Sequence, residues 1–354
     1  MSDQEGSEGK MEKKKRYDFI DYLNILACLC VIFMHCNGIV HSFEYSRAWK
    51  ESMFVEAAAY WAVPVFFMIS GATLMGYRDK YSTGTFFKKR VLKTVIPFIA
   101  WVLINLIFKT AAGIMEPDLS LSGIVDMFNN TTTENVYWFF IPLFMCYLSM
   151  PVLSLLKDNK RVLIYMAAGA FLVYSVYPMV CTFLKIGKNS AVIFPTAGGY
   201  LLFVILGYLL TVTELSKKLR IAVYIMGCLG FALRFGFTVA WSADSGALNQ
   251  TFWGYLNFPS VFLAAGVFVL ARSIHWDRYI CRSSLGGKVV SAIAGAGFGV
   301  YLMHMIVYRI LQHITGLSAH SYLWRFGMPF VIYGICVLAT VLMKKIPVVR
   351  RLVP

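Results

Sequence analysis

Three polar side chains interrupt the first strongly apolar run of the chain, IDYLNILACLCVIFMHCNG at 20–38. In a helix, Asp21, Asn24 and His35 share one stripe, because their separations are close to whole numbers of turns. Asn24 and His35 would then lie ~16 Å apart along the axis. Since an imidazole takes up and returns a proton near neutral pH, His35 is a candidate general base for a hydroxyl nucleophile. The alternative is a packing histidine bonded to a neighbouring main-chain carbonyl.

A second histidine, His304, lies in the late apolar run GFGVYLMHMIVYRI at 297–310. Tyr301 precedes it by three residues and Tyr308 follows it by four, so both fall on its face of a helix. Ionisable residues inside a membrane are functional candidates by default. This group could orient a substrate or pair with His35. The alternative is a core histidine held by a tyrosine hydroxyl.

The strongest basic cluster is FFKKRVLKTVIPF at 86–98. Lys89, Arg90 and Lys93 precede a helix that continues past Pro97, and Arg90 and Lys93 share a helix face. Two fixed cations at the inner mouth of a bundle could hold a phosphate-rich donor. The alternative is ordinary anchoring of the chain by positive charge on the cytoplasmic side.

The composition predicts a polytopic membrane protein. Of 354 residues, 58% are hydrophobic and only 14% are charged, with a mean hydropathy of +0.65. The net charge of +15 is attributed to cytoplasmic loops rather than to nucleic-acid binding. Cys28 and Cys30 face opposite sides of a helix and cannot share a metal. The sequence therefore predicts neither a nucleic-acid partner nor a metal site, and it leaves the oligomeric state open.

The apolar runs predict an all-α bundle of ten transmembrane helices. With the N-terminus inside, the cytoplasmic segments hold 25 of the 33 basic residues and the outer loops hold five. This bias predicts that both termini are cytoplasmic. The expected organisation is a disordered segment at 1–16, a membrane domain at 17–345 and a short cytoplasmic tail at 346–354. The predicted spans are 19–41, 56–76, 92–114, 136–156, 162–184, 199–213, 221–241, 254–271, 289–314 and 326–343.

Four further charged residues fall within these spans or at their ends. Glu56 is expected at the membrane interface, and Lys109 is expected to extend its amine to the outer surface. Arg234 and Arg309 lie deeper, and the sequence identifies no partner for either.

The ordered motifs resemble the membrane acyltransferase type 3 family. The run IDYLNILACLCVIFMH resembles the family's first helix, in which an Asp precedes the active-site His by fourteen residues. Four further segments follow in the family's order, so that the resemblance covers about 18–345. They are VPVFFMISGATLM, FFKKRVLKTVIPF, YWFFIPLFMCYLSMPVLS and GFGVYLMH.

The resemblance implies acyl transfer, usually from cytoplasmic acetyl-CoA, to a hydroxyl of a cell-surface glycan or its lipid-linked precursor. It implies that His35 is catalytic and that Arg90 and Lys93 help to seat the CoA phosphates, with Lys89 beside them. Asp21, Asn24, Tyr301 and His304 are then expected to support the base and to position substrates. The expected partners are acyl-CoA, a carbohydrate acceptor and the lipid of the plasma or inner membrane.

Two departures from the family pattern bear on the donor. The family usually has Arg or Lys eleven residues before the His, where this chain has Asn24, and Pro97 lies one residue further from Arg90 than in many members. A polar stripe through ten spans would also suit an exporter or flippase of a glycan or another polar solute. That reading stays open as the alternative function.

Overall fold

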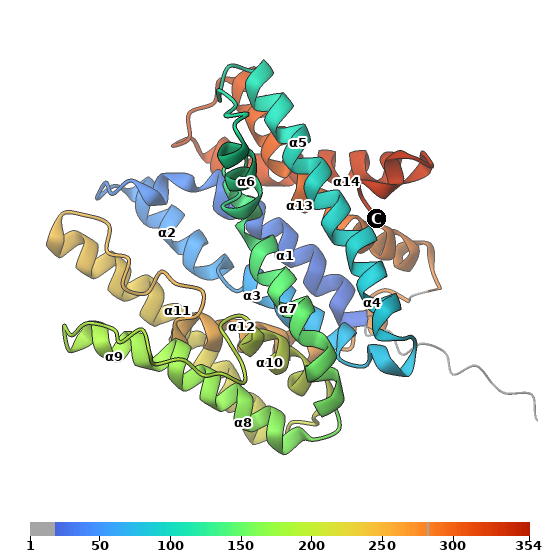
Figure 1. The fold of residues 1–354 in the computed structure, drawn as a ribbon. Coiled ribbons are helices and arrows are strands. Elements are labelled where there is room, and N and C mark those ends of the chain that lie inside the picture. The colour runs from blue at the N-terminus through green and yellow to red at the C-terminus, as the bar shows by residue number, and fades with distance from the viewer. Residues whose placement is uncertain (1–17, 282) are drawn as a thin grey trace, which may run out of the picture.

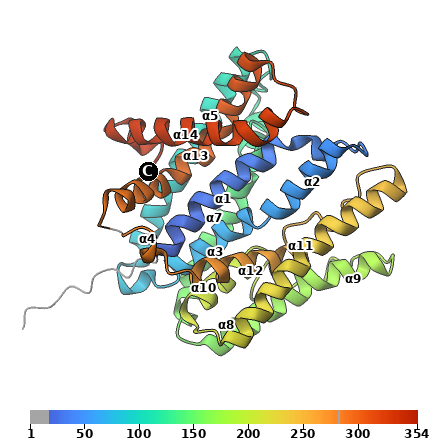
Figure 2. The same cartoon turned by 180° about the vertical axis from the view of Figure 1, so that it is seen from behind.

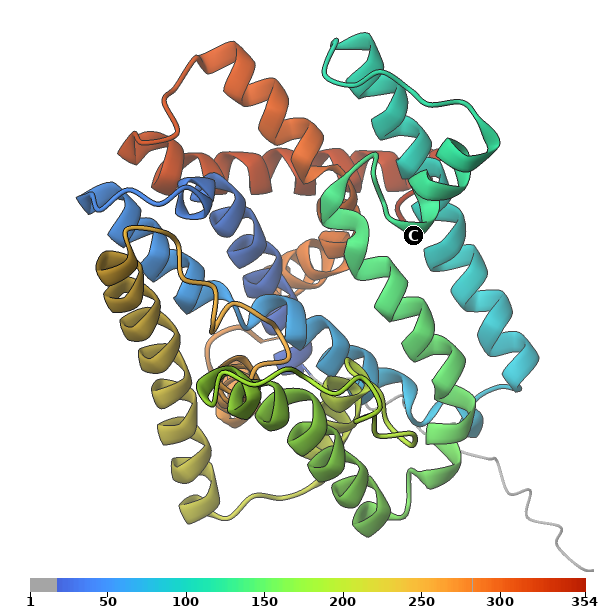
Figure 3. The ribbon, with the colours of Figure 1, turned by 60° about the vertical axis from the view of Figure 1, so that its left-hand side comes forward.

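The computed structural model describes residues 18–281 and 283–354, so the prediction of a disordered segment at 1–16 lies outside the described residues. The regular structure of these residues consists of helices, and the prediction of an all-α fold is confirmed. Helix α1 (Asp18–Cys36) lies at the centre of the bundle (Figure 1, Figure 3). It contacts α2, α3, α12, α13 and α14, whose bounds are given below.

Within the described residues, eight helical segments are long and apolar enough to cross a membrane. The first is α1, and the second joins α2 (Arg47–Ala59) to α3 (Ala62–Leu74). Three more are built on single helices, α7 (Phe140–Leu153), α11 (Lys217–Ser245) and α13 (Leu285–Thr315). The other three contain the widened turns described below. A multi-pass membrane protein follows from this set.

Two apolar helices are shorter, α10 (Leu201–Val212) and α12 (Phe258–Ser273). They coincide with the sixth and eighth predicted spans. The first predicted span extended to residue 41, whereas α1 ends at Cys36. The Asn37 side chain explains this end, because its Nδ2 donates to the carbonyl of Phe33 at 2.9 Å and its Oδ1 accepts from Ser52 at 2.9 Å. An amide that caps a terminal carbonyl in this way closes a helix.

Three π-helical turns each end two residues before a proline. Val91–Val95 separates α4 (Thr83–Arg90) from α5 (Ile96–Ala111) and precedes Pro97. Leu172–Val176 lies between α8 (Lys160–Phe171) and α9 (Tyr177–Phe183), and Leu323–Gly327 leads into α14 (Met328–Lys345). Proline lacks an amide donor and clashes with the carbonyl four residues earlier, and a widened turn relieves both problems. The first of these turns carries Lys93.

Two segments expected to be loop or tail are also ordered against the bundle. The segment at 115–135, which was predicted to be an outer loop, contains the short helix α6 (Leu121–Asn129). The residues after α14 fold back onto α5, where the Trp101 Nε1 donates to the carbonyl of Leu352 at 3.0 Å. Val353 is fully buried. The chain end consequently lies beside α5 in both opposite views (Figure 1, Figure 2).

Buried arginines find partners that the sequence did not identify. Arg234 is 1% exposed, and its guanidinium carbon lies 3.2 Å from the centroid of the Tyr60 ring and its Nη2 3.7 Å from Glu56. Glu56 is therefore buried inside the bundle rather than placed at the interface. Arg325, expected in an outer loop, is also 1% exposed and pairs with Glu51 at 3.0 Å.

Candidate active site

The two candidate histidines come from segments almost 270 residues apart and meet inside the bundle. The centroids of the His35 and His304 rings are 5.2 Å apart. His35 lies in the last turn of α1 and is partly exposed, whereas His304 on α13 is 1% exposed. The structure therefore brings together the pair that the sequence analysis considered.

A main-chain bond fixes the orientation of His304. Its Nδ1 lies 2.7 Å from the carbonyl oxygen of Tyr301. A carbonyl only accepts, so Nδ1 carries the hydrogen and the neutral ring keeps its lone pair on Nε2. That Nε2 is buried without a hydrogen-bond partner in the described part of the chain. Nor does a tyrosine hydroxyl hold this histidine, because the Tyr301 hydroxyl donates to the carbonyl of Val136.

The polar stripe of α1 faces α13 along its whole length. Asn24 Nδ2 donates to the carbonyl of Ala294 at 2.8 Å, and further along, His35 meets His304. The residue further along α1 meets the residue further along α13, so the two helices run parallel. The close approach depends on a glycine of α13. A Cβ on Gly297 would lie 2.7 Å from Asn24 Nδ2.

A cavity of about 310 Å³ brings four of the predicted site residues together. Asn24, Arg90, Lys93 and Tyr301 all line it. Phe66 and Tyr301 also line a second cavity of about 10 Å³, which reaches His304. We call the first space the donor cavity. The two cavities share Phe66 and Tyr301 as lining residues, and His35 lines neither of them but lies against His304.

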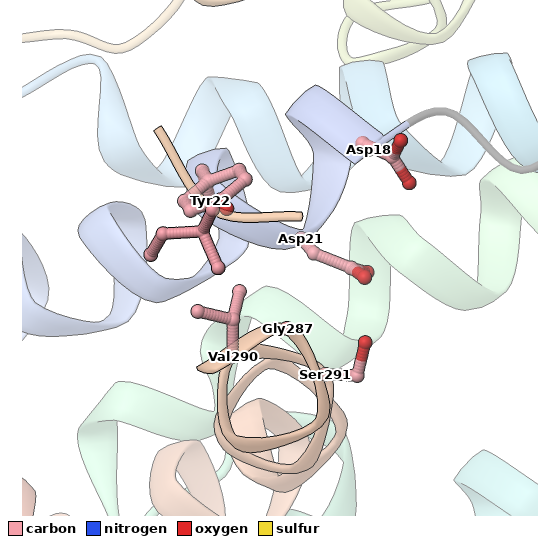
Figure 4. A pocket seen from close by; sticks show the side chains of 7 residues that line it. Asp18, Asp21, Tyr22, Gly287, Val290 and Ser291 are labelled. Atoms are coloured by element: carbon pink, nitrogen blue, oxygen red, sulfur yellow. The ribbon is translucent and has the colours of Figure 1, made fainter. Parts of the chain in front are cut away.

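Four predicted residues do not line the donor cavity: His35 and His304, which form the pair described above, and Lys89 and Asp21. The Lys89 ammonium sits 3.7 Å from the centroid of the Tyr81 ring, because one residue of helix turns its side chain away from that of Arg90. Asp21 lines a separate pocket with Tyr22 and Ser291, about one turn nearer the start of α1 than Asn24 (Figure 4). It belongs to the stripe that faces α13, but it does not reach the donor cavity.

An ion-pair network beside the histidines was missed in the sequence. Glu134 is 2% exposed, and its carboxylate accepts hydrogen bonds from Nη1 and Nη2 of Arg309 at 2.5 and 3.2 Å. Lys109 Nζ lies 3.2 Å from the same carboxylate. Lys109 is thus buried rather than extended to the surface, because a carboxylate inside the bundle attracts it. A lone acid at the end of the loop predicted at 115–135 gave no sign of this role.

The comparisons with known proteins give one match. A family model described as an acyltransferase domain, of type 3, matches residues 17–343. Neither the curated proteins nor the solved structures compared with the chain give a match. Within the described residues, no three His, Cys, Asp or Glu side chains gather in a group that could hold a metal ion.

Proposed function

The chain belongs to the acyltransferase type 3 family, and we propose that it is an O-acyltransferase of the plasma or inner membrane. In this proposal an acyl group, most simply acetyl, moves from cytoplasmic acyl-CoA to a hydroxyl of a cell-surface polysaccharide or its lipid-linked precursor. The observation that carries the proposal is the donor cavity. It is lined by Arg90 and Lys93 and shares Tyr301 with the space that reaches His304.

The cavity suits a long donor with charge at one end and a thioester at the other. Arg90 and Lys93 would bind the phosphates at the cytoplasmic mouth, because charge-assisted hydrogen bonds to phosphate are among the strong ones. The ~16 Å from Asn24 to His35 is a length that an extended pantetheine arm covers. Asn24 would line the path of that arm, where many family members have a cation.

His35 is the proposed general base. The acceptor oxygen attacks the thioester carbonyl carbon while the His35 imidazole takes the hydroxyl proton. The carbon–sulfur bond then breaks, and the CoA thiolate leaves and receives the proton from the imidazolium. His304 and Tyr301 would position the reacting groups, since the lone pair on His304 Nε2 is directed by the bond at Nδ1.

The proposed topology has ten spans with both termini in the cytoplasm. It counts the short helices α10 and α12 as spans, together with the eight longer segments. The parallel course of α1 and α13 is consistent with this count and argues against a chain in which only one of α10 and α12 crosses, because α13 would then run opposite to α1. Arg90 and Lys93 then lie on the cytoplasmic side, where acyl-CoA is available.

Mass spectrometry of surface glycans provides the test. Cells with the protein should carry acyl groups that cells without it lack, and cells with a His35→Ala protein at equal abundance should resemble those without it. The mass difference identifies the acyl group and the sugar that accepts it. An equal acyl content but a reduced amount of glycan would contradict the enzyme and support the exporter.

A further inference from the structure

A third cation, Lys344, lies beside the donor cavity and was not identified in the sequence. Lys344, in the last turn of α14, donates from Nζ to the carbonyl of Gly295 at 2.7 Å. Gly295 lines the donor cavity together with Arg90 and Lys93. Lys93 is also a charged neighbour of Lys344. Neither Lys344 nor the adjacent Lys345 is itself a lining residue, but Lys345 is exposed and the bond to Gly295 is made by Lys344.

None of these three cations is paired with a carboxylate in the described part of the chain, whose ion pairs engage other lysines and arginines. Arg90 Nε is buried and has no hydrogen-bond partner there. Like charges held close together repel, so their collection around one cavity favours a ligand that carries several negative charges.

The cations lie at different depths, and this difference suggests which of them is near the pyrophosphate of CoA and which are near its 3′-phosphate. Arg90 lies further in, with its guanidinium carbon 5.5 Å from the centroid of the Tyr147 ring, whereas Lys93 is exposed. In CoA the pyrophosphate joins the pantetheine arm, and the 3′-phosphate is on the ribose beyond it. A thioester directed inward therefore leaves the pyrophosphate near Arg90 and the 3′-phosphate near the two lysines.

We propose that Lys93 and Lys344 together bind the 3′-phosphate of the donor and thereby select CoA over thioester carriers that lack this group. The inference rests on the proposed function, because it assigns a donor to the same cavity. A phosphate monoester carries nearly two negative charges at neutral pH. Two flexible ammonium groups match it as point charges, and the bond to Gly295 holds one of them at the mouth.

The end of the chain keeps Lys344 in place. The segment after α14 is anchored by the bond from Trp101 to the carbonyl of Leu352 and by the buried Val353, and Pro354 lines the donor cavity. This wall lies just beyond residue 343, where the family match ends.

Calorimetric titration of the purified full chain with CoA and with 3′-dephospho-CoA tests the inference. The unaltered protein should bind CoA at least tenfold more tightly, since a charged hydrogen bond contributes about 1.5–3 kcal/mol. Lys344→Gln should bind CoA about tenfold more weakly and dephospho-CoA within twofold of the original. The glutamine amide can still donate to Gly295. Lys345→Gln removes one positive charge at the adjacent residue and should leave the affinities for CoA and for dephospho-CoA unchanged.

Lys93→Gln provides a second variant with the same expected loss, should Lys344→Gln fail to purify as a single species. Retention of the CoA preference in both variants would overturn the inference, as would an equal loss in Lys345→Gln. Equal binding of the two ligands by the unaltered protein would overturn it and leave the proposed function standing. If neither ligand bound at all, the proposed donor itself would fall, and the inference with it.

Discussion

The two histidines of the site differ in what holds their rings. His304 is fixed by its bond to the Tyr301 carbonyl, whereas no hydrogen bond within the described residues holds the ring of His35. His35 is also the more exposed of the two. A ring that is accessible and has both nitrogens available can accept the proton of an incoming hydroxyl. This contrast supports the assignment of the base to His35 and of positioning to His304.

Replacement of His35 should therefore lower the rate of acyl transfer more than replacement of His304. General-base assistance contributes about 10²–10⁴-fold, so His35→Ala should lower the rate of acyl transfer at least a hundredfold, and His304→Ala by less. The measurement is the initial rate of acyl transfer from acetyl-CoA in membranes with matched protein content. His313→Ala, at the exposed end of the same helix α13, is the control and should keep the full rate. Near-normal transfer by His35→Ala would rule out this mechanism.

The basic cluster offers an internal comparison, because only some of its side chains line the donor cavity. Replacement of both Arg90 and Lys93 by Ala should raise the apparent KM for the donor at least tenfold, from the loss of contacts worth about 1.5–3 kcal/mol each. Lys89→Ala should leave that KM unchanged, since its ammonium lies over the Tyr81 ring. Steady-state rates at varied donor concentration measure both effects. An unchanged KM in the double variant would show that these cations serve only the orientation of the chain.

At the scale of helices, the spacing of the polar residues predicted which face of α1 is polar. It did not predict which helix packs against that face. Residues at whole-turn intervals must share a stripe, so Asp21, Asn24 and His35 could be grouped from the sequence alone. That α13 receives this stripe depends on contacts some 270 residues away, and no local pattern specifies them. The division of the stripe, with Asn24 in the donor cavity and Asp21 outside it, likewise depends on where neighbouring helices leave space.

The network around Glu134 shows the same limit. Lys109 and Arg309 were recognised as charges inside spans, but their shared partner, Glu134, lies at the end of a segment that was predicted to be a loop. A loop carboxylate has no periodicity that could mark it as buried. The connection of α5 and α13 through Glu134 therefore became visible only in the assembled bundle.

Glu134 should be among the most sensitive positions for stability. Glu134→Gln leaves Lys109 and Arg309 in a buried site without their counter-charge, and breaking a buried pair costs about 3–5 kcal/mol. The control is Glu214→Gln, whose carboxylate is 95% exposed in its pair with Arg272 and should contribute about 0–1 kcal/mol. Thermal unfolding in detergent compares the two. Equal midpoints for both variants would contradict a structural role for the network.

At the scale of the whole molecule, charge and geometry agree on the course of the chain. The basic residues concentrate on one set of loops, and α1 and α13 run parallel. Arg325 is one of the five basic residues assigned to the predicted outer loops, and its buried pair with Glu51 neutralises it within the protein. Hydropathy located the ten helical segments in the sequence. Because α10 and α12 are short, their length does not decide whether they cross the membrane, and a topology experiment is needed.

Cysteine labelling of intact cells distinguishes the possible topologies. In a protein with the exposed Cys228 and Cys281 replaced by Ser, a cysteine introduced at Asp126 or Ala247 should react with a membrane-impermeant maleimide. One introduced at Ser216 should react only after the membrane is permeabilised. All three positions are exposed in the fold, so a failure to react reports the membrane barrier rather than burial. If α10 did not cross, the loops before and after it would share one side, and Ser216 would be labelled in intact cells. That result would remove the ten-span topology and place the mouth of the donor cavity in doubt.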